Sequence, residues 1–161
     1  MPKNQKLSSR ILDEKDKKIL MALQQDGRMQ LKEISKKVNL TIDSVHNRIK
    51  EMIKKKVFET GIFIEPRVIG YPLLADIKIK LKNISKDERE KFIAYLINHK
   101  RCIDLLAIMG DYDFTCVLIA KDSNDLEEVS TEIRQKFKEL ILEWKGMLIL
   151  KTYKFEKYNL L

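Results

Sequence analysis

Residues 40–54 read LTIDSVHNRIKEMIK, and this stretch decides the first part of the fold. Thr41 is a favourable N-cap residue for a helix. The apolar residues that follow it are spaced to share one helical face: Ile42, Val45, Ile49, Met52 and Ile53. Lysines close the stretch, where the helix dipole favours cations. We therefore predict a helix from Thr41 to about Lys55 with one buried face.

Two shorter helices are predicted before this one. Asp13 is a good N-cap for the first helix, and Asp26-Gly27 ends it. In the second helix, apolar residues recur at i, i+3 and i+7, namely Leu31, Ile34 and Val38. Asn39 tolerates the left-handed conformation that a tight turn needs. Three short helices, the last two joined by a tight turn, predict a helix-turn-helix.

A small β wing is predicted directly after the helices. Val57-Phe58 and Ile62–Ile64 have strand character, and Thr60-Gly61 between them can form a turn. The predicted domains are a tail at residues 1–12, a winged helix-turn-helix at 13–64, a linker at 65–72 and a second domain at 73–161.

The second domain alternates strands and helices. Apolar and polar residues alternate along Ala75–Leu81, and Ser85-x-x-Glu88 is a capping box that opens a helix. A second helix begins at Asp122-Ser123 and carries apolar residues as far as Leu140. The other strands are expected at Cys102–Met109, Phe114–Ala120 and Met147–Phe155. The order βαββαβ predicts a ferredoxin-like domain, and the whole chain is of the α+β class.

The strand at Cys102–Met109 predicts self-association. Strict alternation would place apolar residues on both of its faces: Ile103, Leu105, Ala107 and Met109 on one, and Leu106 and Ile108 on the other. Two helices can cover only one face of a four-stranded sheet. A second copy of the same sheet is the simplest cover for the other face.

The positive charge of the chain is confined to its first third. The net charge is +8, and residues 1–56 hold 15 Lys and Arg against 7 Asp and Glu, which accounts for all of it. A basic module joined to a neutral one suggests that only the first part meets a polyanion, although a solvated lysine-rich surface would also fit.

Several classes of protein are not expected. No apolar run approaches the roughly 20 residues that span a bilayer, and no signal peptide is apparent, so we expect a cytoplasmic protein without a membrane partner. The chain has only two cysteines and two histidines, which argues against a metal site. No catalytic residue and no cofactor is predicted, and the chain is not expected to be an enzyme.

Several motifs resemble the Lrp/AsnC family of transcription regulators. They are Leu12-Asp13-x-x-Asp16-x-Lys18-Ile19-Leu20, Asp26-Gly27-Arg28, Glu33-Ile34, Leu40-Thr41-x-x-x-Val45-x-x-Arg48-Ile49 and Gly110-Asp111-Tyr112-Asp113. The resemblance implies a winged helix-turn-helix joined to an effector domain, assembled as a homodimer or as a higher assembly of dimers such as an octamer. It also implies binding to pseudo-palindromic double-stranded promoter DNA and, for many members, a response to amino acids. The chain departs from the family at Gln30, Asn39 and Lys56, where serine, glycine and glycine are usual.

The predicted recognition helix supplies the DNA-binding residues. Its outward face offers Ser44 and Asn47 as base readers, with His46 as a weaker choice. The cations of the helix suit phosphates: Arg48, Lys50, Lys54 and Lys55. The alternative is a solvated polar face with no contact to DNA.

Gly110, Asp111, Tyr112 and Asp113 form a predicted turn between two strands. The two carboxylates could serve acid–base chemistry, but ordinary turn chemistry explains them better. A third interpretation is an effector site. Asp111 or Asp113 would accept the ammonium of an amino acid, and free backbone N–H groups would hold its carboxylate.

Two rival functions remain open. An amino-acid-sensing regulatory subunit or an enzyme could use the same ferredoxin-like fold, but the basic first third speaks against both. An RNA-binding protein is the other rival. Residues 1–56 contain no Phe, Tyr or Trp for stacking bases, which disfavours it.

Overall fold

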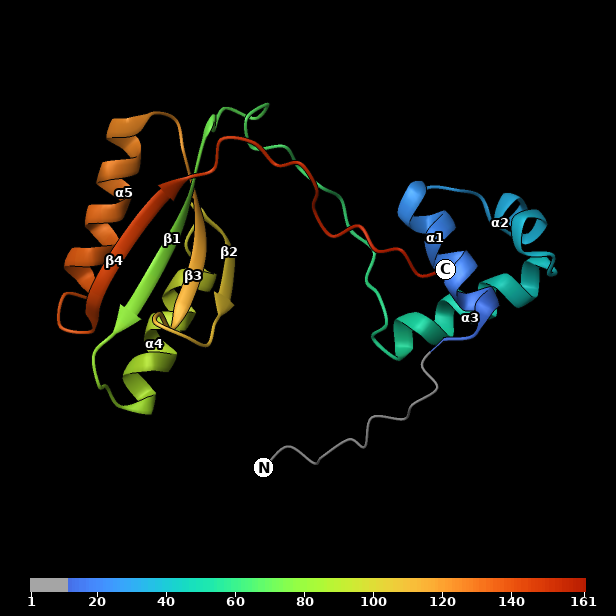
Figure 1. Cartoon of the computed structure of the whole chain (residues 1–161), viewed down its shortest axis with the longest axis horizontal. Coiled ribbons are helices and arrows are strands. Elements are labelled where there is room, and N and C mark those ends of the chain that lie inside the picture. The colour runs from blue at the N-terminus through green and yellow to red at the C-terminus, as the bar shows by residue number, and fades with distance from the viewer. Residues whose placement is uncertain (1–11) are drawn as a thin grey trace. The chain divides into compact units, whose positions relative to one another are not determined.

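The computed structural model describes residues 12–161, which form two compact units (Figure 1). The predicted tail at 1–12 lies outside these residues except for Leu12. The first unit extends to Phe63 and also contains Lys154–Leu161, whereas the second unit is Ile64–Tyr153. The sequence boundaries assigned residues 154–161 to the second domain, so the structure groups them differently. None of the helices in residues 12–161 combines the length and apolarity of a membrane span.

The first unit is a helix-turn-helix of three helices, as predicted. They are α1 (Glu14–Gln25), α2 (Leu31–Val38) and α3 (Ile42–Lys54). Asp13 caps α1 in a reciprocal capping box with Asp16, and the Thr41 side chain accepts the Ser44 N–H to cap α3. Gln30 precedes α2 without a side-chain cap. The buried core consists of Ile19, Ala22, Ile34, Val38, Val45 and Met52.

Three non-glycine residues of this unit have a positive φ, namely Asn39, Lys56 and Glu156, and the first two lie at the ends of helices. Asn39, with φ 52° and ψ 62°, forms the turn between α2 and α3, as expected. Lys56 has φ 55° just after α3, and its N–H donates to the Ile53 carbonyl. Lysine bears the steric cost of this conformation at a position where glycine would not.

The predicted β wing is wrong, because residues 57–64 contain no strand. Val57 and Phe58 pack against the helical core, so their apolar side chains are not available to a hairpin. Gly61 lacks the positive φ that a tight hairpin turn of the common type requires. Ile62 and Phe63 are left 85% and 81% exposed.

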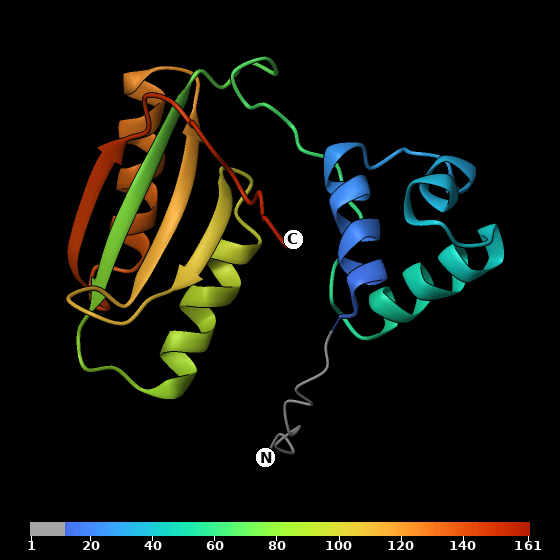
Figure 2. The ribbon, with the colours of Figure 1, turned by 45° about the vertical axis from the view of Figure 1, so that its right-hand side comes forward.

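The second unit is a four-stranded antiparallel sheet with two helices, which confirms the predicted βαββαβ order. Its elements are β1 (Leu73–Leu81), α4 (Lys86–Ile97), β2 (Cys102–Ala107), β3 (Phe114–Ala120), α5 (Ser123–Lys136) and β4 (Ile141–Leu148). The strand order is β2-β3-β1-β4. Both helices lie on one face of the sheet (Figure 2), where Phe92 and Leu96 of α4 and Ile133 of α5 join the buried core.

Two strands end at other residues than predicted. The last strand was expected at Met147–Phe155 but is Ile141–Leu148, because it pairs along β1 from Leu81↔Ile141 to Ala75↔Leu148. Beyond Leu148 only Leu73 and Leu74 of β1 remain, and the Ile149 N–H donates to the Leu74 carbonyl, so the pairing ends there. The strand at Cys102 ends at Ala107 and not at Met109, which is fully exposed. In this sheet β2 is an edge strand, so the Gly110–Asp113 turn joins an edge strand to an inner one.

A bulge in β2 changes which of its residues face the helices. The pairing shifts between Cys102 and Asp104, so that Cys102 and Leu105 both pack against the core. Leu106 pairs with Thr115 on the uncovered face and is 53% exposed. Strict alternation had placed Ile103 and Leu105 together, which the bulge prevents.

The uncovered face of the sheet is less apolar than the sequence of β2 suggested. Lys78 donates to Thr115 at 3.0 Å and lies 2.8 Å from Asp76, and the Thr115 hydroxyl donates to Asp76. Lys80 and Glu143 form a further pair across β1 and β4 at 3.7 Å. Apolar side chains therefore flank a polar centre on this face.

Candidate nucleic-acid interface

The exposed side of α3 carries most of the predicted DNA-binding residues. Asn47, Lys50 and Lys54 are exposed and follow one another at i, i+3 and i+7, which places them on one stripe of the helix. His46 is exposed beside this stripe, and Ser44 is half-buried at the first turn. The structure therefore brings these side chains together on one surface.

The buried side of α3 is narrower than predicted. Val45 and Met52 are buried and Ile49 is half-buried, but Ile42 and Ile53 are 45% and 42% exposed. Ile42 is the first residue of α3, beside Asp43 at the exposed end of the helix. Sequence reasoning assigned it to the core because its spacing fits the buried stripe, and the small core of this unit leaves it outside.

Arg48 is positioned by two carboxylates of α1. Its guanidinium Nη1 donates to Asp13 Oδ2 and to Asp16 Oδ1, both at 2.7 Å. The Asp16 backbone amide and then Arg48 lower the pKa of Asp13 by hydrogen bonding to its charged form. The side-chain bonds of Arg48 to Asp13 and Asp16 raise the pKa of Arg48. This contact ties α3 to the first turn of α1, which was not predicted for a residue expected to meet phosphate.

The lysines of α3 leave positive charge on its exposed face. Lys55 Nζ lies 3.8 Å from Glu51 Oε2, and both side chains of this pair are exposed. Among the described residues, Lys50 and Lys54 have no carboxylate within ion-pair distance. Such uncompensated cations at a helix surface attract a polyanion.

The Gly110–Asp113 turn is partly committed to the fold. One carboxylate oxygen of Asp113 accepts the Leu81 N–H at 2.7 Å, its N–H donates to Ile79, and its carbonyl accepts the Ile108 N–H. Gly110 has φ 146°, with open space where a Cβ would stand. Asp111 is exposed and Tyr112 is half-buried. Only Asp111 therefore has a carboxylate free of the backbone bonds that build the turn.

Each unit contains a cavity, and neither cavity is lined by the Gly110–Asp113 turn. One, of about 580 Å³, lies in the helical unit between α1, α2 and residues 157–161. The other, of about 250 Å³, lies in the second unit between α5, β1 and β4, where Trp144, Gly146 and Arg134 line it. The sequence offered no sign of either, because each depends on how distant segments pack.

Comparison with known proteins decides the family. The model of the AsnC-type helix-turn-helix domain matches residues 12–53, and that of the Lrp/AsnC ligand binding domain matches residues 74–158. The chain belongs to the Lrp/AsnC family. It is thus a transcriptional regulator with a ligand-binding domain.

Named relatives of this Lrp/AsnC chain are also regulators. It is 32% identical over 151 residues to the HTH-type transcriptional regulator FL11 of Pyrococcus horikoshii, covering 89% of this chain and 92% of that protein. It is 34% identical over 118 residues to FL11 of Pyrococcus furiosus, covering 72% of this chain and 76% of that protein.

Solved structures share the fold of this Lrp/AsnC chain. An AsnC family transcriptional regulator from Agrobacterium tumefaciens matches with a TM-score of 0.83 at 18% identity, over 92% of this chain and 97% of that one. A transcriptional regulator of Neisseria meningitidis, solved in complex with L-Met, matches with a TM-score of 0.80 at 23% identity, over 89% and 93% of the two chains.

Proposed function

We propose that this regulator binds specific double-stranded DNA sequences by placing the exposed face of α3 in the major groove. The observation that carries the proposal is the stripe of Asn47, Lys50 and Lys54, which is exposed and uncompensated in the part of the chain that holds all the net positive charge. A major groove admits one helix, and residues near its N-terminus reach the base edges.

The residues of α3 divide into three roles. Asn47 can pair with adenine N6 and N7, and Ser44 and His46 flank it as further readers. Ile42, exposed at the first turn, can contact a thymine methyl group. Lys50, Lys54 and Lys55 bind phosphates, and Arg48 holds α3 against α1 so that the readers are correctly oriented.

The active form is a two-fold dimer built through the uncovered face of the sheet. Leu106, Val117 and Met147 lie on that face, around the ion pair of Asp76 and Lys78. A second copy would remove these side chains from water. The two recognition helices of such a dimer would bind successive major grooves, whose centres are about 34 Å apart on DNA. Dimers can assemble further into an octamer through a second surface, because the two-fold contact already occupies the uncovered face of both copies.

The effector is an amino acid that binds at the Gly110–Asp113 turn, between subunits. The family's ligand-binding domain and the L-Met complex of the Neisseria meningitidis regulator favour this ligand class. Asp111 is the better partner for the ammonium, because the Asp113 carboxylate already accepts the Leu81 N–H. Such a regulator works in the cytoplasm, where its DNA and amino acids meet.

The salt dependence of DNA binding tests the phosphate contacts. Lys54→Ala with Lys55→Ala should weaken binding to every duplex and lower the slope of log affinity against log salt by about 0.9 per lost contact. Lys138→Ala, which removes an exposed lysine from the second unit, is the control and should leave the slope unchanged. An unchanged slope in the double variant would refute the phosphate assignment.

A further inference from the structure

The last residues of the chain dock onto helix α1. The Gln24 side-chain amide pairs reciprocally with the backbone of Tyr158: Nε2 donates to the Tyr158 carbonyl, and the Tyr158 N–H donates to Oε1, both at 2.8 Å. This two-point contact copies one rung of a β ladder. The primary amide of Gln24 supplies both the donor and the acceptor that this contact needs.

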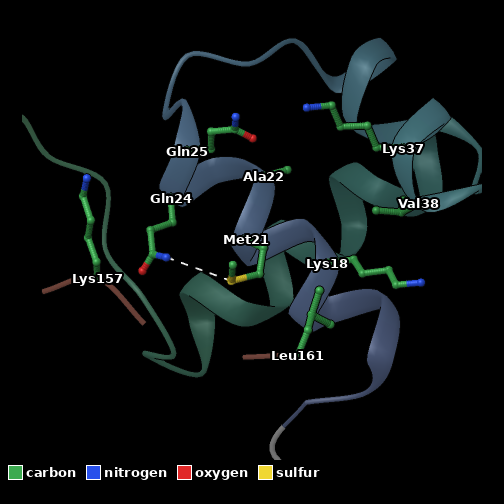
Figure 3. Close-up of a pocket in the computed structure, with 9 residues that line it drawn as sticks. All are labelled: Lys18, Met21, Ala22, Gln24, Gln25, Lys37, Val38, Lys157 and Leu161. Atoms are coloured by element: carbon green, nitrogen blue, oxygen red, sulfur yellow. Dashed lines mark hydrogen bonds between the residues drawn. The ribbon is translucent and has the colours of Figure 1, made fainter. Parts of the chain in front are cut away.

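Apolar contacts extend this docking on both sides of Tyr158. Leu161 lines the 580 Å³ cavity together with Met21, Ala22 and Val38 (Figure 3). Phe155 meets the edge of Phe63, with ring centroids 5.6 Å apart and planes at 84°. The contact is shallow, since Phe155 and Tyr158 remain 52% and 62% exposed, so the docked segment can be released by a small perturbation.

The same stretch of chain is anchored at its other end in the second unit. The Ile149 N–H donates to the Leu74 carbonyl at 2.8 Å, and Arg67 Nη2 donates to the Ile149 carbonyl at 3.0 Å. Between Leu150 and Phe155 lie five residue steps, which span at most about 17 Å when fully extended.

The chain therefore passes between the two units twice. It leaves the helical unit after Phe63 and returns to it at Lys154, a few residues after β4 ends at Leu148. A single flexible linker would let the helical unit sample a wide volume, whereas a second anchored connection reduces that volume.

We propose that residues 149–161 are a second tether of the DNA-binding unit, fastened to α1 by Gln24, and that this tether raises the affinity for paired half-sites. It limits the distance over which one recognition helix searches once the other is bound, and so raises the effective concentration of the second binding event. Because the tether follows β4, a rearrangement of the sheet would reach α1 through it. The DNA consequence rests on the proposed function, whereas the docking itself does not.

Gln24→Ala removes both hydrogen bonds to Tyr158, and Gln25→Ala is the matched control, since Gln25 is also exposed and lines the same cavity. Limited trypsin digestion of the full-length protein at Lys154 and Lys157 measures docking. Cleavage should be several-fold faster in Gln24→Ala than in Gln25→Ala or the unaltered protein. Equal rates would refute the docking, whatever the protein does with DNA.

The affinity for DNA tests whether the tether strengthens binding to paired half-sites. On a selected duplex with two half-sites, Gln24→Ala should bind about three- to tenfold more weakly than the unaltered protein, because part of the advantage of bivalent binding is lost. On the same duplex with one half-site scrambled, affinity should change less than about twofold, because single-site contacts are intact. A chain truncated after Tyr153 should behave like Gln24→Ala.

If Gln24→Ala were cleaved faster but bound the duplex with two half-sites as tightly as the unaltered protein, the proposed role of the tether in DNA binding would be refuted. The docking of the segment on α1 would still stand. If the unaltered protein showed no preference for the two-site duplex, the proposed function would fail, and with it the DNA consequence. The digestion would still decide the docking by itself.

Discussion

Arg48 in α3 and Asp16 in the first turn of α1 form an ion pair of 2.7 Å, 32 residues apart in sequence. The same nitrogen of Arg48 also binds Asp13, the residue that caps α1. The contact therefore connects the recognition helix to the start of the first helix, and it accounts for an arginine at a position that sequence reasoning assigned to phosphate.

Replacing Arg48 by alanine should lower the free energy of unfolding by about 1 kcal/mol, since the pair is partly exposed and its charges remain hydrated. Lys50→Ala, two residues further on, is the control and should change stability by less than about 0.5 kcal/mol. Urea denaturation at neutral pH measures both. A loss no larger for Arg48→Ala than for Lys50→Ala would contradict the structural role.

The Arg48 contribution should depend on pH in a defined direction. The folded-state pKa of Asp13 is lowered below its ordinary value of 3.8. The stabilisation is therefore complete above the unfolded-state pKa and disappears as the pH falls through the lowered folded value. The difference between the unaltered protein and Arg48→Ala should be constant above about pH 5 and shrink below pH 3.8. A constant difference down to about pH 2 would exclude this linkage.

Lys56→Gly should stabilise the protein by about 0.5–1 kcal/mol. Lysine at φ 55° bears a left-handed backbone cost that glycine avoids, partly offset by the greater freedom of glycine in the unfolded chain. Asn39→Gly is the comparison and should gain less, because asparagine tolerates this conformation. Thermal unfolding of the two variants decides the matter, and destabilisation by Lys56→Gly would show that the lysine side chain contributes contacts that outweigh the strain.

Leu106→Glu should break the proposed dimer. Leu106 lies on the uncovered face of the sheet, and a charge buried there without a partner costs several kcal/mol. Ile97→Glu is the control: Ile97 is 66% exposed on α4, on the covered side of the sheet. Sedimentation should show a smaller species for Leu106→Glu and an unchanged assembly for Ile97→Glu. Dimers that survive the Leu106 change would place the interface elsewhere.

Amino-acid binding should depend more on the Asp111 carboxylate than on the Asp113 carboxylate, because Asp111 is the proposed contact to the ligand. A ligand at 100 times its dissociation constant adds about 2.7 kcal/mol of stability, which a thermal shift detects. Asp111→Asn should abolish that gain in a screen of the twenty amino acids and leave the ligand-free protein as stable as before. Asp113→Ala should destabilise even the ligand-free protein by about 1–2 kcal/mol, because the Leu81 N–H loses its acceptor. A shift that survives Asp111→Asn would assign the turn a structural role only.

The elements of the fold followed from local signals, and the errors arose where tertiary contacts override them. Capping at Asp13, Thr41 and Ser85 placed three helix starts correctly, because a cap is a contact between neighbours in sequence. The prediction of a wing was wrong because Val57 and Phe58 pack on a core that no local pattern shows. The β2 bulge likewise depends on pairing with β3 and shifted the apolar faces by one residue.

The exposed face of α3 was also predictable in outline, because it follows from local sequence. Helical periodicity located the exposed stripe of Asn47, Lys50 and Lys54, since position on a helix sets which side chains share a face. It could not reveal that Arg48 is held by Asp13 and Asp16, nor that Ile42 is exposed. Both depend on how α1 packs on α3. The docking of Tyr158 on Gln24 spans 134 residues and has no sequence signal at all.

The affinity of Asn47→Ala for a selected duplex and for random DNA decides whether Asn47 reads a base. Asn47→Ala should lose about 1–3 kcal/mol of binding free energy on the selected duplex and almost none on random DNA, because only base contacts distinguish the two. Equal losses on both duplexes, or no loss on either, would contradict it.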